Sequence, residues 1–229
     1  MQRSGASSSW RHTIVRNTTG FQIPGRAITG GVTFNESPLI LRDVLFEGST
    51  AEDALNVILA SIDFDDVRFS GTASDAFDGD AVTGRISDTG FIGIAGDGVD
   101  FSASDVVGSN LTFFDIGDKA VSAGEGSSVQ ISNLTVDTAS IGVASKDMSG
   151  VEITGGRFDN IRNYTFASYQ KKSEYGPATL TASSTTIAPG SLAMLVEQGS
   201  ELNVNGSKIE TQAVDIADLY DAGILGSLN

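Results

Sequence analysis

Short runs of alternating apolar and polar residues recur along the chain. The run 62–69 reads Ile-Asp-Phe-Asp-Asp-Val-Arg-Phe, and this period of two predicts a strand with one buried face. A bulky apolar residue closes each run, at intervals of 22 or 23 residues with one interval of 29: Phe46, Phe69, Phe91, Phe113, Val136, Phe158, Ile187 and Ile209. A second apolar column keeps the same spacing: Leu55, Phe77, Val99, Val121, Val143 and Phe166. The chain is therefore built from a repeated unit of about 22 residues.

The length of this unit selects one fold class. No unit contains an amphipathic helix of about ten residues or more, which excludes leucine-rich, ankyrin and tetratricopeptide arrays. A propeller blade needs roughly forty residues. We therefore predict an all-β fold, a right-handed parallel β-helix that forms a single-stranded solenoid of about eight coils. The second apolar column should stack inside it as one ladder.

Breaks in the repeat predict the domain organisation. We expect one β-helix domain over 1–229, with an irregular first coil at 10–38 and regular coils at 39–214. The insert at 170–177 should project as a loop, and the residues 215–229 should cap the last coil. Because no comparable cap is visible at the start of the chain, we expect it to be a fragment of a larger protein.

Acidic residues occupy equal positions in successive units. The first column holds Asp53, Asp75 and Asp97, followed by Lys119. The second holds Asn56, Asp78, Asp100 and Ser122, and the third holds Ile58, Asp80, Ser102, Gly124 and Lys146. Because equal positions stack at about 4.8 Å, one face of the second to fifth coils should concentrate acids, with lysines at its C-terminal end.

Carboxylates stacked in this way repel one another, and three interpretations remain open. The first is an exposed cluster that binds a divalent cation, with calcium the expected ion because it prefers oxygen ligands. Its ligands would be Asp75, Asp78, Asp80, Asp97 and Asp100. Calcium should then raise the melting temperature, and Asp78→Asn with Asp97→Asn should remove most of the gain.

The second interpretation is a catalytic site for polysaccharide cleavage, with Asp78, Asp100, Lys119 and Lys146 as its residues. Paired carboxylates suit a glycosidase, and a lysine suits a lyase if its neighbours lower its pKa. The third interpretation is that Asp and Asn only support turns, since both tolerate and bind turn backbones.

The composition limits the classes of partner that the protein is expected to bind. The formal net charge is −15, from 29 acidic and 14 basic residues, which disfavours nucleic acid and anionic membranes. No apolar stretch is long enough to span a bilayer. The chain has no cysteine and one histidine, His12, so thiolate metal sites and histidine-based triads are excluded.

The stretch from about Trp10 to Ala178 resembles β-helix modules of the pectate-lyase-like superfamily in large secreted bacterial surface proteins, some with a spore-coat-kinase-like domain. The segments that carry the likeness are 52–56, 74–80, 117–125, 144–147, 167–172 and 174–177. The resemblance implies a fold and an extracellular location, without an activity. The Gly-His-Gly and Arg-Ile-Lys motifs of the similar polygalacturonases do not occur, and no arginine stands in the acidic columns as in pectate lyases.

We therefore expect a non-catalytic extracellular or cell-surface bacterial module, an acidic scaffold that binds a cation, a glycan or a neighbouring domain. The alternative is a carbohydrate-active enzyme, a polysaccharide lyase or a glycoside hydrolase, that uses the same Asp and Lys face. The partners would be a polysaccharide or adjacent domains of the same protein.

Overall fold

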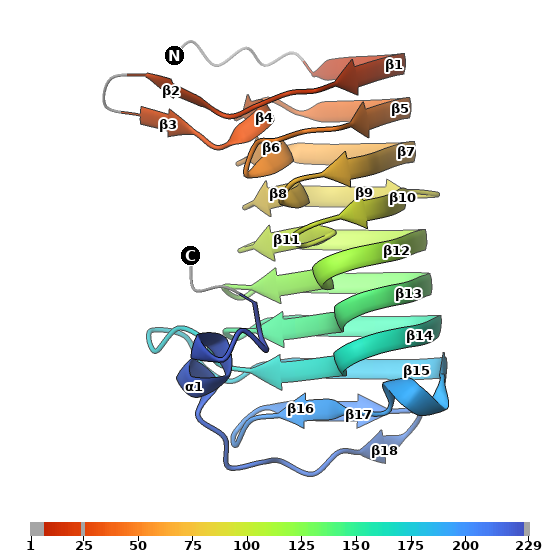
Figure 1. The fold of residues 1–229 in the computed structure, drawn as a ribbon, viewed down its shortest axis with the longest axis vertical. Helices are drawn as coiled ribbons and strands as arrows, with labels where there is room; N and C mark the ends of the chain where they lie inside the picture. Colours follow the sequence, from red (N-terminus) through yellow and green to blue (C-terminus); the bar gives the residue numbers. More distant parts are fainter. Residues whose placement is uncertain (1–6, 24–25, 227–229) are drawn as a thin grey trace.

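The strands of this protein stack in parallel, each pairing with the strands one coil before and one coil after it. The computed structural model describes residues 7–23 and 26–226, and these form a β-solenoid of about eight turns (Figure 1). The predicted parallel β-helix, with coils of about 22 residues, is confirmed.

Two long walls make up each coil. The first wall is formed by β1 (Ser8–Arg16), β5 (Leu39–Glu47), β7 (Ser61–Thr72), β9 (Thr83–Ser87), β10 (Gly90–Ile94), the first parts of β12 (Asp105–Gly124), β13 (Ser128–Lys146) and β14 (Gly150–Tyr169), then β15 (Thr179–Ile187) and β17 (Glu201–Val204). The second wall is formed by β4 (Gly30–Asn35), β6 (Asp53–Ile58), β8 (Asp75–Asp80), β11 (Val99–Ser102), the last parts of β12, β13 and β14, and β16 (Met194–Val196).

Both apolar columns point inward and stack in register. The second wall pairs Leu55 with Phe77, Phe77 with Val99, and Val99 with Val121. The ladder continues to Val143, and all five side chains are at most 1% exposed. The predicted interior ladder is therefore confirmed.

The first column forms an aromatic stack inside the first wall. Successive rings of Phe46, Phe69, Phe91 and Phe113 lie with centroids 4.5–5.1 Å apart and planes within 8° of parallel. Trp10 packs on Phe46 at the start of this stack, at 6.4 Å. The column keeps its register as far as Ile187. Because each unit buries its apolar face only against its neighbours, the coils stabilise one another.

One column of turn residues supports the backbone of the first wall. The turn between the two halves of this wall places a residue with a positive φ of 49–58° in six successive coils: His12, Asp43, Asp66, Asp88, Asn110 and Asn133. Asn and Asp adopt this left-handed conformation more readily than other non-glycine residues. Neighbouring coils are linked there, since Asn110 donates to Asp88 and Asn133 donates to Asn110. The tolerance of Asn and Asp for this conformation therefore accounts for a column that lies apart from the acidic columns of the second wall.

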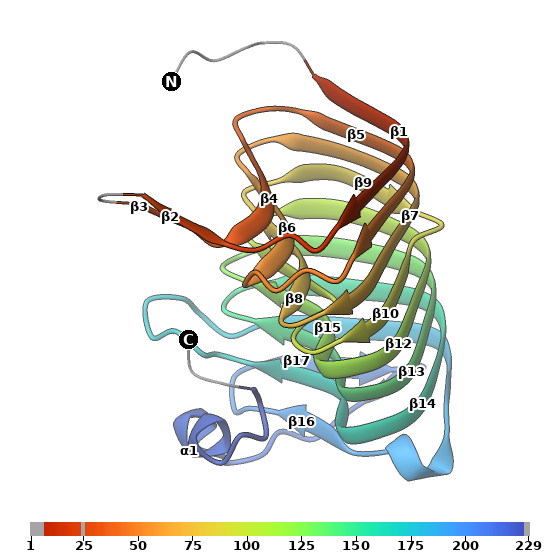
Figure 2. The ribbon, with the colours of Figure 1, turned by 45° about the horizontal axis from the view of Figure 1, so that its top comes forward.

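The departures from the repeat lie on the side of the second wall (Figures 1 and 2). The first coil is extended by an antiparallel hairpin of β2 (Phe21–Ile23) and β3 (Arg26–Ile28), which lies within the range 10–38. Residues 170–177 form a loop after β14. On the other wall, the 3₁₀ turn η1 (Pro189–Ser191) follows β15.

The segment predicted as a cap, 215–229, lies partly outside the described residues, and its described part, 215–226, turns back along the solenoid. The last coil ends in β18 (Ser207–Lys208), which pairs with β17 in an antiparallel direction. The chain then turns back, and α1 (Ile216–Asp221) packs beside the second wall, where Ile216, Tyr220 and Leu225 complete a small apolar cluster with Tyr169. Burial of these side chains against the wall favours this position over the end of the solenoid.

Candidate functional site

The first acidic column binds the backbone of the following coil. Asp75 Oδ1 accepts a hydrogen bond from the N–H of Asp97 at 2.7 Å, and Asp97 Oδ1 accepts one from the N–H of Lys119 at 2.8 Å. Asp53 pairs with Asp75 in the same column. These carboxylates therefore have a structural role at the start of each second-wall strand, and Asp97 is only 5% exposed.

The second and third columns stand on the same wall. Asp78 lies beside Asp100 and Asn56 in the register, and Asp80 lies beside Ser102. Asn56 Nδ2 donates to Asp78 Oδ2 at 2.5 Å. Among the residues whose side chains the structure describes, no lysine or arginine nitrogen lies within 4 Å of the carboxylates of Asp75, Asp78 or Asp80. These three acids therefore form no ion pair with the described lysines and arginines.

Burial and crowding raise the pKa values of several of these carboxyls. Burial, followed by the charges of Asp80, Asp53 and Asp100, raises the pKa of Asp78 to about 9. Burial and the charge of Asp97 raise the pKa of Asp75 to about 8. Burial also raises the pKa of Asp80. The face therefore favours any bound group that brings positive charge.

Asp78→Asn should make the protein more stable at alkaline pH. A carboxyl whose folded-state pKa is raised contributes stability below its unfolded pKa, and that stability is lost as the pH rises toward about 9. Asparagine copies the protonated form, so the variant should match the parent near pH 4. At pH 8 it should gain about 1–3 kcal/mol, after allowance for the partial exposure of Asp78. Urea unfolding from pH 4 to pH 9 measures this difference. Glu210→Gln, at an exposed position outside the face, should leave the pH profile unchanged, and an equal gain in both variants would contradict the assignment.

The two lysines at the C-terminal end of the face are buried and reach back by one or two coils. Lys119 Nζ lies 2.7 Å from Asp118 Oδ2 and 3.5 Å from Asp97 Oδ1. Lys146 Nζ lies 3.7 Å from Asp100 Oδ1. Its stem crosses the fifth coil over Gly124, where a Cβ atom would stand 3.4 Å from Lys146 Cε.

The charges around these lysines oppose a role as general base. Burial alone would lower the pKa of Lys119, but the charges of Asp97 and Asp118 outweigh it and raise the pKa above its ordinary value. At Lys146, the charge of Asp100 outweighs burial in the same way, so the pKa of Lys146 is also raised. The lysines predicted as candidate bases therefore stay protonated at neutral pH. The lyase alternative required a lowered lysine pKa, and the acids close to both ammonium groups act in the opposite direction.

The C-terminal segment, residues 215–226, covers the lower part of this face. The hydroxyls of Tyr220 and Tyr169 lie 2.8 Å apart, and Asn163 Nδ2 donates to the carbonyl of Ile224 at 3.1 Å. Gly226, with φ of +97°, passes so close to Asp118 that a Cβ atom would stand 2.1 Å from its Oδ2. Only glycine suits this conformation and this contact. The sequence pattern of the repeat gave no signal that this segment would meet the acidic columns.

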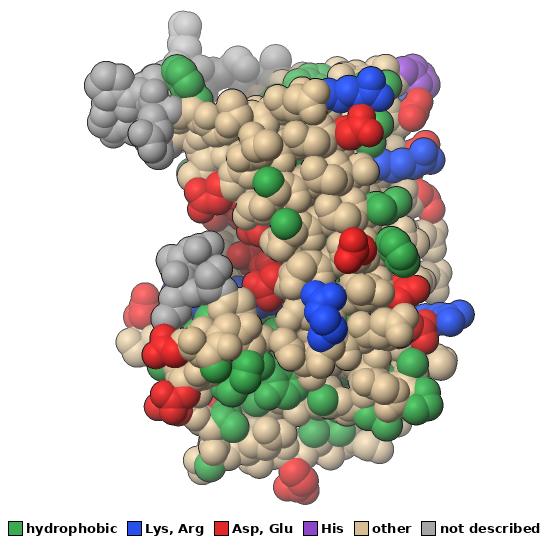
Figure 3. Space-filling view, in the orientation of Figure 1, with side chains coloured by type: hydrophobic (Ala, Val, Ile, Leu, Met, Phe, Trp, Pro, Cys, Tyr) green, Lys and Arg blue, Asp and Glu red, His purple; other side chains and the backbone are tan. Residues whose placement is uncertain are grey.

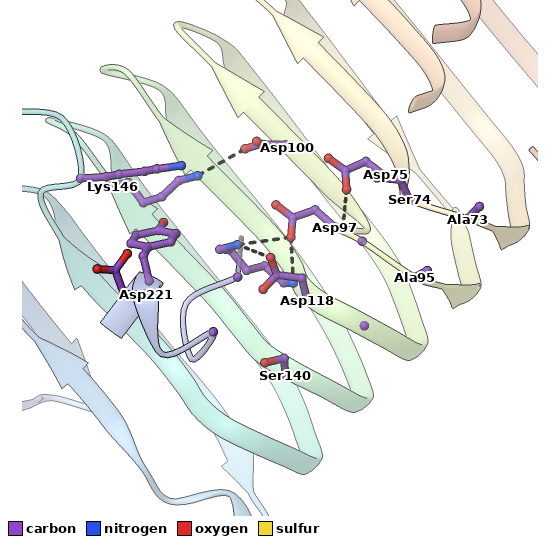
Figure 4. A pocket seen from close by; sticks show the side chains of 17 residues that line it. Ala73, Ser74, Asp75, Ala95, Asp97, Asp100, Asp118, Ser140, Lys146 and Asp221 are labelled. Carbon is purple, nitrogen blue, oxygen red and sulfur yellow. Dashed lines mark hydrogen bonds and ion pairs between the residues drawn. The ribbon is translucent and has the colours of Figure 1, made fainter. Parts of the chain in front are cut away.

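A cavity of about 680 Å³ lies between the second wall and the C-terminal segment (Figures 3 and 4). Its charged and aromatic lining comes from Asp75, Asp97, Asp100, Asp118, Lys119, Lys146, Lys171, Tyr220 and Asp221. Asp78 and Asp80 do not line it. The structure therefore divides the predicted site between an open acidic face and a cavity of mixed charge.

The five predicted cation ligands are less exposed than the sequence led us to expect. Asp97 is buried, and the other four predicted ligands are partly buried. Within the part of the chain that the structure describes, no three acidic or histidine side chains are grouped so that they could hold a metal ion. The reason is that Asp75 and Asp97 point their oxygens along the solenoid toward backbone N–H groups.

Fold and site together define a class, the β-solenoids, here a parallel β-helix with a charged second wall. In comparisons with known proteins, no protein-family model and no curated protein matches the chain. None of the described helices is long and apolar enough to cross a membrane.

Proposed function

We propose that this protein is a non-catalytic β-helix module, located outside the cell or on its surface, that binds a cation on the acidic face of its second wall. The observation that carries the proposal is the presence of Asp78 and Asp80 on the same strand, β8, with no lysine or arginine nitrogen within 4 Å among the residues whose side chains the structure describes. Since no three described acids are grouped as metal ligands, water would supply the other ligands of the cation. Partners would be a polysaccharide or adjacent domains. The location, and a place in the pectate-lyase-like superfamily, rest on the resemblance of the sequence to secreted surface modules.

Binding is favoured over catalysis by the state of the charged groups. Lys119 and Lys146 are held as cations by neighbouring acids, so neither can accept a proton near neutral pH. Asp75 and Asp97 each hold a backbone N–H of the next coil. A lyase or glycosidase that used this face would have to release one of these groups from its present contact.

Calcium should raise the melting temperature of the protein at pH 8 and physiological salt. Calcium prefers carboxylate oxygens and accepts water as additional ligands, and a ligand bound only by the native state adds about 2.7 kcal/mol at a hundredfold excess over its Kd. The double variant Asp78→Asn with Asp80→Asn should lose most of this gain. We choose this pair because Asp97, in the pair predicted from the sequence, also holds Lys119.

The control variant is Glu201→Gln with Glu210→Gln, at two exposed acids of the last coil and its exit. It removes the same charge and should keep the calcium effect. A titration to millimolar calcium that shifts the melting temperature no more than sodium at equal ionic strength would refute cation binding. A shift that persists in the Asp78→Asn, Asp80→Asn variant would refute the location.

A further inference from the structure

The cavity under the C-terminal segment is lined by charges of both signs. Asp75, Asp97 and Asp100 line it from the earlier coils, and Lys146 faces them from a later coil (Figure 4). Lys171 and Tyr220 also belong to the lining, as do the small residues Ala95, Gly96 and Gly117. A cavity of about 680 Å³ is within the range of sites for small molecules.

Lys146 is a buried cation that forms an ion pair but no hydrogen bond with the described residues. Its side chain is 9% exposed, yet its ammonium makes no hydrogen bond with any described residue. The carboxylate oxygen within 4 Å of it, Asp100 Oδ1, lies at 3.7 Å, and this oxygen has no hydrogen-bond partner either. Buried charged groups normally satisfy their donors and acceptors. This pair is therefore suited to hold a group that bonds to both.

Lys171 adds a second ammonium to this lining. Its Nζ stands 4.7 Å from the centre of the Tyr220 ring, and no described carboxylate lies within 4 Å of it. Burial, and then the charges of Lys146 and Lys119, lower its pKa. A bound anion would relieve this repulsion between ammonium groups. Lys119 is not available, since Asp118 and Asp97 already neutralise it.

Asp100 Oδ1 and Lys146 Nζ form an ion pair at 3.7 Å, which is too long for a direct hydrogen bond. A ligand that bonds to both must therefore place a donor and an acceptor close together. An α-amino acid has this property, because its ammonium and carboxylate flank a single carbon atom. Its side chain would have room in the remaining volume of the cavity.

We propose that this cavity binds a free α-amino acid, with its carboxylate on Lys146 and Lys171 and its ammonium on Asp100. The inference adds a second ligand to the proposed binding role. It stands separately from cation binding at Asp78 and Asp80, since neither residue lines the cavity.

Calorimetric titration of the full chain tests the proposal with L-serine and L-glutamine, against lactate, which lacks the ammonium, and ethanolamine, which lacks the carboxylate. Both amino acids should bind saturably, and the two partial analogues should bind at least tenfold more weakly. Lys171→Gln should weaken binding several-fold and Lys146→Met at least tenfold. Lys208→Gln, at an exposed lysine paired with Glu201, should bind like the parent.

Lys171 is half-buried in a loop, so its variant keeps the test valid if Lys146→Met folds poorly. Absence of saturable heat with either amino acid would overturn the proposal, as would lactate or ethanolamine binding as tightly as serine. Unchanged affinity in the folded lysine variants would also overturn it. Because the calcium response is measured separately at Asp78 and Asp80, a failure here leaves cation binding intact, and a failure of cation binding leaves this result intact.

Discussion

Val99→Asp should abolish folding of the whole domain. Val99 is 1% exposed and stands in the interior ladder between Phe77 and Val121. An aspartate there would bury an unpaired carboxylate in an apolar core, which costs more than about 4–5 kcal/mol. That cost approaches the total stability of an ordinary domain, about 5–15 kcal/mol. We expect the variant to be insoluble or to lack a cooperative thermal transition.

Val107→Asp is the matched control for this experiment. Val107 lies in β12 on the outside of the first wall and is 53% exposed. The same substitution there removes no core packing, so it should change the free energy of unfolding by no more than about 0.5 kcal/mol. A soluble Val99→Asp protein that melts like Val107→Asp would disprove the inward orientation of the ladder.

Lys119→Met should cost about 3–5 kcal/mol of stability at pH 8. Methionine keeps most of the stem but removes the cation that faces Asp97, whose carboxylate is 5% exposed. Removal of one partner of a buried ion pair leaves the other charge uncompensated, and this has a large cost. Burial already raises the pKa of Asp97 to about 6 in the parent. The loss should therefore shrink as the pH falls through and below this value, because Asp97 can then be protonated.

The double variant Lys119→Met with Asp97→Asn separates charge from packing. Asparagine removes the buried charge and retains an oxygen for the N–H of residue 119, so the double variant should recover most of the stability lost by Lys119→Met. Lys208→Met serves as the control, because its ion pair with Glu201 is exposed on both sides and such pairs contribute little. Urea unfolding of the parent, the two variants and the control measures this recovery, and a double variant no more stable than Lys119→Met would refute the charge argument.

The candidate site shows which features the columns in the sequence could predict and which they could not. Equal spacing placed Asp75 beside Asp97, and Asp78 beside Asp100, in the correct register. It did not show that Asp97 would be buried or that the lysines would reach back toward earlier coils. Side-chain direction along the solenoid depends on which backbone groups of the next coil need acceptors, and the repeat length carries no information on that need.

The sequence by itself determined the fold and its register. A period of 22 residues leaves a coil too short for helices, and the apolar columns can be buried only when coils stack in register. Only the tertiary structure decided where the C-terminal segment lies. The apolar side chains of Ile216, Tyr220 and Leu225 find their partner in Tyr169 of a much earlier coil, and no local pattern predicts a contact between residues so far apart in sequence. That contact closes the cavity over Lys146 and Asp100, so the charged pocket exists because the tail turns back along the second wall.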